Sequence, residues 1–321
     1  MDLIFFGTPT FAVPSLRALH GAGHRILCVV TQPDRPRGRG RQPAPPAVKK
    51  AALDLGLETL QPNRAGSPDI VEMLAALEAD LGVVIAYGEI LKPDLLDATE
   101  RGFVNAHASL LPDYRGAAPI NWAVMRGKDV TGVTIIRMEP ELDAGPILAQ
   151  REVPISDEET AGQLHDRLAE VAADLLCDVV NRMDAGETIE ERRQPAETGF
   201  FARKLTKEDG RIDWTRGAAE ITDRVRGLTP WPGAYGALEC KEGHIRVTLL
   251  RVKADETEPA AGPPGTVLRA DEEEGIVVRA GGGAVRILKL KPAGSRAMSA
   301  ADFLHGHDVE PGDRFGPETN P

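Results

Sequence analysis

An amide, an imidazole and a hydroxyl lie close together in the run Asn105-Ala106-His107-Ala108-Ser109. Residues 103–107 begin with apolar side chains and are predicted to form a strand. Because side chains alternate along a strand, Asn105 and His107 share one face and Ala106 points to the other. An amide N–H can stabilise an oxyanion and an imidazole can move a proton, so this pair suits acyl transfer. A lone histidine at a strand end can also be purely structural.

A carboxylate from the acidic loop Glu139–Gly145 is expected beside this imidazole. The loop follows the next predicted strand, and a doubly wound sheet can bring Asp143 to His107. Such a carboxylate would orient the ring and favour its protonated form. Glu139 and Glu141 are alternative partners, and Asp143 could instead be a turn residue before Gly145.

Ser109 is an alternative nucleophile, two residues after His107. It lacks the GxSxG turn that exposes a nucleophilic serine, and it opens an apolar Ser-Leu-Leu-Pro corner that favours binding. Without a convincing nucleophile, Asn105, His107 and Asp143 favour direct transfer of an acyl group to an external amine. Asn105 would hold the oxyanion, and His107 would move a proton between the attacking amine and the leaving nitrogen.

The elements that position these residues alternate between apolar strands and helices. Strands are predicted at 3–6, 25–31, 81–87, 103–107, 131–136 and 147–153, and helices at 14–20, 48–55, 67–79, 118–126 and 160–184. This α/β order predicts right-handed crossovers and a Rossmann-like, mostly parallel sheet. The loop at Gly7 is not a GxGxxG fingerprint, which disfavours a nicotinamide enzyme. The end of the strand at 81–87 falls where such sheets bind ligands.

A smaller second domain is predicted at 204–321, after a catalytic domain at 1–189 and a linker at 190–203. A helix at 218–226 precedes short strands at 234–239, 245–252, 265–269, 275–279 and 284–290, separated by turns rich in Gly and Pro. Short strands of this kind predict an OB-like β-barrel.

The formal net charge of −11 would repel a polyanion, so a nucleic acid must be bound by local basic patches. Residues 35–50 contain six basic side chains and no acidic one, with Gly and Pro that predict a long exposed loop without regular structure. The loop is either a solvated surface or an arm that binds an RNA backbone. Residues 275–301 form a second basic, acid-free stretch.

The sequence disfavours a metal site, a disulfide framework and a membrane-spanning segment. The three cysteines form no CxxC pair, and the seven histidines form no HExxH motif. His305 and His307 lie close together but bring no carboxylate cluster, so no metal is expected. No stretch approaches the roughly 18 apolar residues of a membrane span. The apolar start is too short for a signal sequence, so a cytoplasmic protein is expected.

The run Asn-x-His-x-Ser-Leu-Leu-Pro-x-x-Arg-Gly at 105–116, with Leu-Asp-x-Gly at 142–145, resembles the formyltransferases that use 10-formyltetrahydrofolate. The resemblance implies that Asn105, His107 and Asp143 are catalytic and that this folate is the co-substrate. It also implies that two segments contact the folate, through Ser109, Leu110, Leu111 and Pro112 and through Ile85, Tyr87, Gly88 and Ile90. Within these enzymes the acceptor is a glycinamide ribonucleotide, an amino sugar nucleotide or an aminoacyl-tRNA.

Residues 31–40, 204–214 and 290–298 are similar to the methionyl-tRNA formyltransferase branch in particular. That resemblance implies formyl transfer to the α-amino group of methionine on initiator tRNA, by direct attack through a tetrahedral intermediate. It implies tRNA contacts from the arginine-rich loop and the OB-like domain, through Arg35, Arg37, Arg39, Arg41, Lys289, Lys291 and Arg296. By its position, Arg39 is expected to matter most. A formyltransferase for a small amine and a non-catalytic RNA-binding protein are the alternatives, and a monomer is expected.

Overall fold

The computed structural model describes residues 1–37, 42–195, 199–255 and 262–316. The chain divides into two compact units. The N-terminal unit comprises residues 1–119, 130–154 and 165–202, and the C-terminal unit comprises residues 120–129, 155–164 and 203–321. The domain boundaries drawn from the sequence at 189 and 204 stay predictions.

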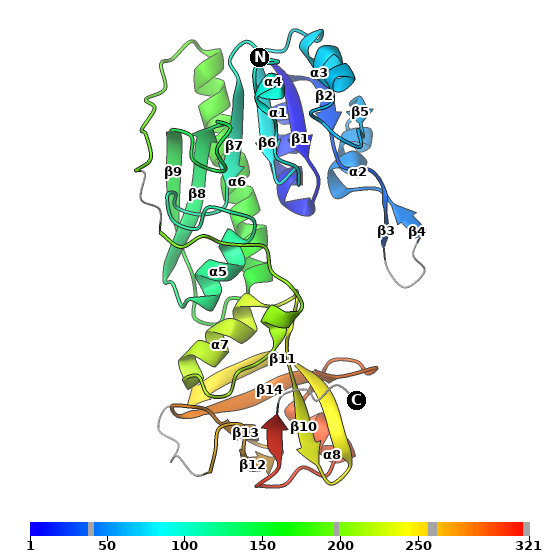
Figure 1. Ribbon diagram of the computed structural model, residues 1–321, viewed down its shortest axis with the longest axis vertical. Helices are drawn as coiled ribbons and strands as arrows, with labels where there is room; N and C mark the ends of the chain where they lie inside the picture. The colour runs from blue at the N-terminus through cyan, green and yellow to red at the C-terminus, as the bar shows by residue number, and fades with distance from the viewer. Residues whose placement is uncertain (38–41, 196–198, 256–261, 317–321) are drawn as a thin grey trace. The chain divides into compact units, whose positions relative to one another are not determined.

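A seven-stranded sheet forms the centre of the N-terminal unit, in the order β5-β2-β1-β6-β7-β8-β9 (Figure 1). Its strands are β1 (Asp2–Gly7), β2 (Arg25–Val30), β5 (Thr59–Leu60), β6 (Leu81–Ile85), β7 (Phe103–His107), β8 (Val130–Arg137) and β9 (Ile147–Pro154). The pairs from β5 to β7 are parallel, whereas β8 is antiparallel to both β7 and β9. The predicted Rossmann-like, mostly parallel sheet is confirmed.

Helices and short 3₁₀ turns connect and cover these strands. They are η1 (Thr10–Ala12), α1 (Val13–Gly21), α2 (Ala47–Asp54), α3 (Pro68–Ala75), α4 (Pro93–Leu96), α5 (Pro119–Met125) and α6 (Ala161–Asp184). Side chains of α3 and α4 share one core cluster with Ile4 and Phe6, which leaves the opposite face, with Leu3 and Phe5, to α1 and α6. The helix predicted at 67–79 ends early because the chain turns out of it at Glu78, where φ is 51°.

The prediction of an irregular loop from Arg35 is wrong for residues 35–37 and 42–44, whereas the helix predicted at 48–55 is confirmed as α2. Residues Arg35–Arg37 (β3) and Gln42–Ala44 (β4) form an antiparallel ribbon, and α2 begins at Ala47. Pro36 lies directly opposite Pro43. Antiparallel pairs alternate between bonded and non-bonded positions, so two prolines can face each other where neither N–H is needed. A proline-rich sequence can therefore form a short ribbon.

A curled antiparallel sheet forms the C-terminal unit, in the order β12-β13-β14-β11-β10-β16 with β15 beside β14. Its elements are η2 (Glu208–Gly210), α7 (Ala218–Gly227), β10 (Ala234–Cys240), β11 (Gly243–Asp255), β12 (Val267–Asp271), β13 (Gly275–Arg279), β14 (Ala284–Pro292), β15 (Met298–Ser299), α8 (Ala300–Gly306) and β16 (Arg314–Gly316). The bridge between Thr266 and Arg314 joins the two edges of the sheet. The predicted small β-domain is confirmed, although the sequence prediction omitted β15, α8 and β16.

Candidate active site

Asn105 and His107 lie at the end of β7, whose bounds are those predicted from the sequence. His107 is buried, with 6% of its surface exposed, whereas Asn105 is half-buried. Within the part of the chain that the structure describes, the Asn105 amide makes no hydrogen bond. The alternation along the strand therefore puts a buried imidazole next to an amide whose N–H groups are free for a ligand.

The two nitrogens of the His107 ring face different partners. Nε2 lies 3.0 Å from the backbone carbonyl oxygen of Tyr114. Because a carbonyl can only accept, Nε2 carries the hydrogen, and the neutral ring has its lone pair on Nδ1. Nδ1 lies 3.7 Å from Oδ2 of Asp143. That separation is too long for a direct hydrogen bond but close enough for the carboxylate to stabilise a protonated ring.

Asp143 reaches His107 as the sequence predicted, but by a different path. Since β8 runs antiparallel to β7, Arg137 at the end of β8 lies opposite Val104, at the start of β7. The following loop must return along β7 to bring Asp143 to the imidazole. The alternative partners, Glu139 and Glu141, are exposed.

Asp143 is held in an unusual backbone conformation. Its φ is 51°, in the left-handed region that costs most residues about 1–2 kcal/mol and that Asp and Asn tolerate best. Oδ2 accepts a hydrogen bond from the backbone N–H of Gly116 at 3.0 Å. The Leu-Asp-x-Gly loop and the Arg-Gly end of the central motif are thus in direct contact.

Most of the segment predicted as a linker at 190–203 is hydrogen-bonded to the rest of the N-terminal unit through its described residues up to Ala202. Arg192 exchanges two backbone hydrogen bonds with Ile147, at 2.8 and 2.9 Å. Further along, the carbonyl of Phe200 accepts from Tyr114 N at 2.9 Å, and Ala202 N donates to the carbonyl of Arg115 at 2.7 Å. Residues after α6 therefore build part of the site, which the sequence did not indicate.

Ser109 is engaged in local structure. It is completely buried, and its hydroxyl donates to the backbone carbonyl of Asp113 at 2.7 Å. Of the other residues in the predicted folate corner, Leu110 packs against Gly132, Leu111 is buried and Pro112 is half-buried. The arrangement fits a binding corner better than a nucleophile.

The second predicted folate segment alternates between buried and exposed residues. Ile85 and Tyr87 are buried, so these two can offer a ligand only main-chain atoms. Burial raises the pKa of Tyr87 to about 12, which keeps its phenol neutral. Gly88 is exposed with φ 94°, and Ile90 is an apolar side chain with 69% of its surface exposed. Gly88 and Ile90 are therefore the members of this segment that a ligand can cover.

Two of the first predicted tRNA contacts, Arg35 and Arg37, belong to β3. Arg35 is exposed, the backbone of Arg37 ends β3, and Arg39 and Arg41 lie outside the described residues. The root of the ribbon is fixed at Asp34, whose carboxylate accepts from Lys49 Nζ at 2.9 Å and from Gln61 Nε2 at 2.7 Å.

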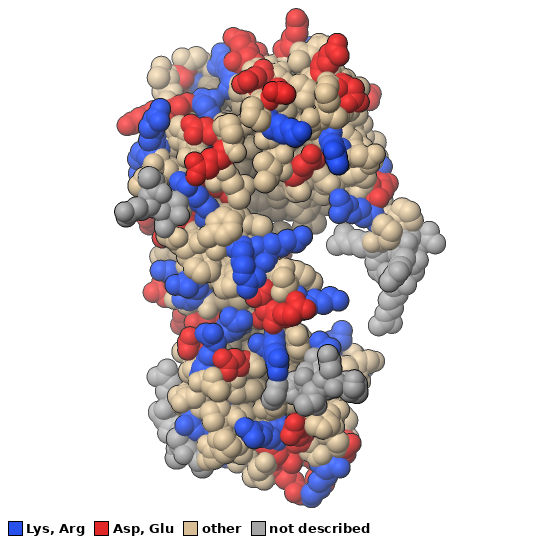
Figure 2. Space-filling model, viewed as in Figure 1, with Lys and Arg blue, Asp and Glu red and all other residues tan. Residues whose placement is uncertain are grey.

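The second group of predicted tRNA contacts lies on and after β14. Lys289 and Lys291 are exposed and face Arg251 and Thr248 across the β11–β14 ladder, and Arg296 is exposed in the turn that follows. Figure 2 shows side chains of both signs on one face of the molecule, with acidic ones densest at the end of the N-terminal unit where β1 and β6 begin. A uniform basic surface is absent from this view, so polyanion binding would have to be local.

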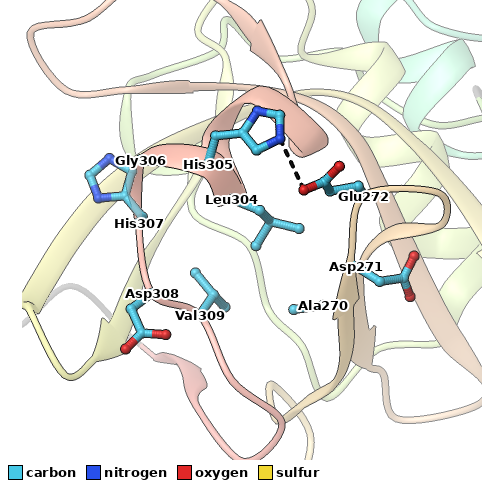
Figure 3. A pocket seen from close by; sticks show the side chains of 9 residues that line it. All are labelled: Ala270, Asp271, Glu272, Leu304, His305, Gly306, His307, Asp308 and Val309. Atoms are coloured by element: carbon cyan, nitrogen blue, oxygen red, sulfur yellow. Dashed lines mark ion pairs between the residues drawn. The ribbon is translucent and has the colours of Figure 1, made fainter.

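A cavity of about 640 Å³ opens beside α8 in the C-terminal unit (Figure 3). Its lining includes His305, whose Nε2 lies 3.0 Å from Oε1 of Glu272. It also includes His307, whose Nδ1 lies 2.7 Å from Oε2 of Glu242. Among the described residues, no three His, Cys, Asp or Glu side chains are grouped as metal ligands.

No helix in the described chain is both long and apolar enough to cross a bilayer.

Comparisons with known proteins agree on one family. The model of the formyl transferase domain matches residues 1–180, and that of the formyl transferase C-terminal domain matches residues 204–308. The methionyl-tRNA formyltransferase of Citrifermentans bemidjiense is 44% identical over 316 residues, covering 98% of this chain and 96% of that protein. The methionyl-tRNA formyltransferase of a Methylobacterium species is 45% identical over 315 residues, covering 98% and 99%.

Solved structures share the fold at lower identity. An N-formyltransferase from Helicobacter canadensis, in complex with folinic acid and dTDP-3-aminofucose, has a TM-score of 0.65 at 16% identity, covering 89% of this chain and 98% of that one. HypX from Aquifex aeolicus, in complex with tetrahydrofolic acid, has a TM-score of 0.60 at 19% identity over 94% of this chain, which spans only 46% of HypX. These two support the fold alone. The family is shown by the matched domains and the full-length relatives: the chain belongs to the methionyl-tRNA formyltransferase family.

Proposed function

We propose that the chain transfers the formyl group of 10-formyltetrahydrofolate to the α-amino group of methionine on initiator methionyl-tRNA. The observation that carries the chemistry is the half-buried Asn105 amide, without a partner among the described residues, beside a buried His107 whose Nδ1 faces Asp143. The acceptor is inferred from relatives of that name, which match 98% of this chain. We expect the protein to act in the cytoplasm, where this tRNA occurs, and as a monomer.

The reaction replaces one bond to the formyl carbon with another. The neutral amine attacks the formyl carbon, and the carbonyl oxygen becomes an oxyanion that the Asn105 N–H stabilises. Collapse of the tetrahedral intermediate breaks the bond to N10 of the folate. An α-amino group with a pKa near about 8 is partly neutral at physiological pH, so the amine needs little activation before attack.

The attacking amine must lose a proton and N10 of the folate must gain one. The imidazole of His107 can accept the first proton and donate one to N10. Because Nε2 is occupied by the Tyr114 carbonyl at 3.0 Å, the atom that exchanges the proton is Nδ1. Asp143 stabilises the imidazolium that forms between the two transfers, since its carboxylate lies 3.7 Å from Nδ1. No covalent enzyme intermediate is required, consistent with the engaged hydroxyl of Ser109.

Replacing the two β7 side chains tests the chemistry. In an assay of formyl-methionyl-tRNA formation, Asn105→Ala should lower kcat by about 10²–10³-fold, the usual loss of an oxyanion donor. His107→Ala should lower it by about 10²–10⁴-fold. The control His20→Asn removes an imidazole from the last turn of α1 and should leave the rate unchanged. Near-normal rates in folded Asn105 and His107 variants would exclude this mechanism.

Replacing Arg37, Arg39 and Arg41 by Ala tests the acceptor. For a tRNA substrate, the loss of three phosphate contacts should weaken binding and reduce the slope of log K against log salt by about 3. The folate affinity, measured by calorimetry on the same variant, is the internal control. An unchanged salt slope would point to a small amine as the acceptor.

A further inference from the structure

Gln194, in the segment after α6, contacts the Asp143 loop and Arg115 at the same time. Its Nε2 donates to the backbone carbonyls of Asp143 at 2.9 Å and of Gly145 at 2.8 Å. Its Oε1 accepts from Nε and Nη2 of Arg115, at 3.1 and 2.8 Å. Since carbonyls only accept and a guanidinium only donates, these four bonds fix the orientation of the amide.

The Asp143 backbone needs such a tether. Its φ of 51° is strained for a residue with a side chain. On one side the loop is pressed against β8, because a Cβ on Gly145 would lie 1.9 Å from the carbonyl oxygen of Arg137. Gln194 holds the carbonyls of the same turn, so the turn is fixed both by packing and by hydrogen bonds.

Gln194 is itself anchored by contacts within the protein. Two residues earlier, Arg192 pairs with Ile147 through two backbone hydrogen bonds, so the main chain approaching Gln194 is anchored. Its other partner, Arg115, is 8% exposed. A donor anchored in this way can define the position of Asp143 rather than follow it.

We propose that Gln194 is a positioning residue for formyl transfer: by bonding the carbonyls of residues 143 and 145 it sets the distance between the Asp143 carboxylate and His107. This inference rests on the proposed function, because the distance matters only if these two side chains serve the reaction. A displacement of about 1 Å in a reacting group can cost on the order of 10²-fold in rate. Gln194 touches neither substrate in this role and acts through Asp143.

Two substitutions separate the possible roles of the amide. Gln194→Met keeps the length of the side chain and removes all four hydrogen bonds. Gln194→Glu keeps an acceptor for Arg115 but cannot donate to the two carbonyls. We expect both to lower kcat by about 10–100-fold with little change in KM for tRNA or folate. Gln163→Met, which removes the side-chain acceptor of Thr160 N at the start of α6, is the matched control and should retain the wild-type kcat.

A double-mutant cycle distinguishes positioning from a general structural role. In an Asp143→Asn background, adding Gln194→Met should lower kcat by less than about twofold, because the group being positioned has already lost its charge. Equal losses in both backgrounds would overturn the inference, as would a wild-type kcat in Gln194→Glu. If Gln194→Met fails to fold, the same cycle can be measured with Gln194→Glu, because its carboxylate can still accept hydrogen bonds from the buried guanidinium of Arg115.

A spectroscopic readout separates failure of this inference from failure of the proposed function. The ¹⁵N resonance of His107 Nδ1 should move in the same direction in Gln194→Met as in Asp143→Asn, whichever amine is formylated. An unshifted resonance in Gln194→Met would refute the positioning role even in an active enzyme. A wild-type protein that does not formylate methionyl-tRNA would refute the proposed acceptor and leave this resonance as the test of Gln194.

Discussion

Asp143→Asn isolates the charge of the carboxylate from its shape. Asn has the same size, tolerates the left-handed backbone at φ 51° and can still accept the hydrogen bond from Gly116 N at 3.0 Å. The oxygen that accepts this bond is also the one 3.7 Å from His107 Nδ1, so an amide oxygen should take its place there. The substitution thus removes a negative charge with little change in geometry.

The expected loss follows from the distance. Two unit charges 3.7 Å apart interact by about 4.5 kcal/mol at an effective dielectric constant of about 20, which is an upper bound for the stabilisation of an imidazolium. The side chains of His107 and Asp143 are 7% and 11% exposed, so screening by water is limited. At about 1.4 kcal/mol per factor of ten, kcat should fall by roughly 10²–10³-fold.

Single-turnover formylation of methionyl-tRNA measures this loss, with thermal unfolding as the control for folding. We expect the unfolding midpoint of Asp143→Asn to stay close to that of the wild type. Asp143→Ala should lose as much activity and, because Ala tolerates a positive φ less well, about 1 kcal/mol of stability in addition. A folded Asp143→Asn protein with a wild-type rate would show that the imidazole does not depend on this carboxylate.

Three further substitutions test other parts of the structure. Gly145→Ala should cost roughly 1–3 kcal/mol of unfolding free energy in chemical denaturation, because its Cβ would lie 1.9 Å from the Arg137 carbonyl oxygen. Asp34→Asn, at the root of the β3–β4 ribbon, should raise KM for tRNA with kcat unchanged in steady-state kinetics. A hydrogen bond from Arg203 lowers the pKa of Asp209 from 3.8 to about 2, so the stability that this carboxylate adds is present above pH 3.8 and lost as the pH falls toward 2. Acid unfolding of Asp209→Asn should therefore depend less on pH in that window.

The sequence sufficed where the signal is local. The apolar start of β7 and the alternation that follows determine both the bounds of the strand and the shared face of Asn105 and His107. The Leu-Asp-x-Gly motif indicated Asp143 as the partner, and the ion-pair distance of 3.7 Å agrees. The antiparallel direction of β8 was not foreseeable, because an apolar strand reads the same way in a parallel or an antiparallel pair.

The positions of Gln194 and of strand β16 depend on long-range contacts, which produce no hydrophobic periodicity in the sequence. Gln194 lies in a charged stretch without regular structure, and its position depends on the backbone pairing of Arg192 with Ile147, which lies 45 residues earlier in the chain. Likewise β16 has three residues, Arg314–Gly316, and exists because β10 and the chain before β12 offer it hydrogen-bonding partners. A segment of three residues is too short for its hydrophobic periodicity to predict a strand.

The backbone at Gly116 restricts which residue can occupy this position in the site. Its N–H binds the Asp143 carboxylate at 3.0 Å, two residues after the Tyr114 carbonyl that fixes the His107 ring. Its φ is 119°, and a Cβ there would lie 2.6 Å from the carbonyl oxygen of Ala202. Any side chain at 116 must therefore displace the segment that returns through Ala202 or rotate the N–H away from Asp143. Either change would alter both partners of the imidazole at once, so glycine at 116 is required for the ring and the carboxylate to keep their relative positions.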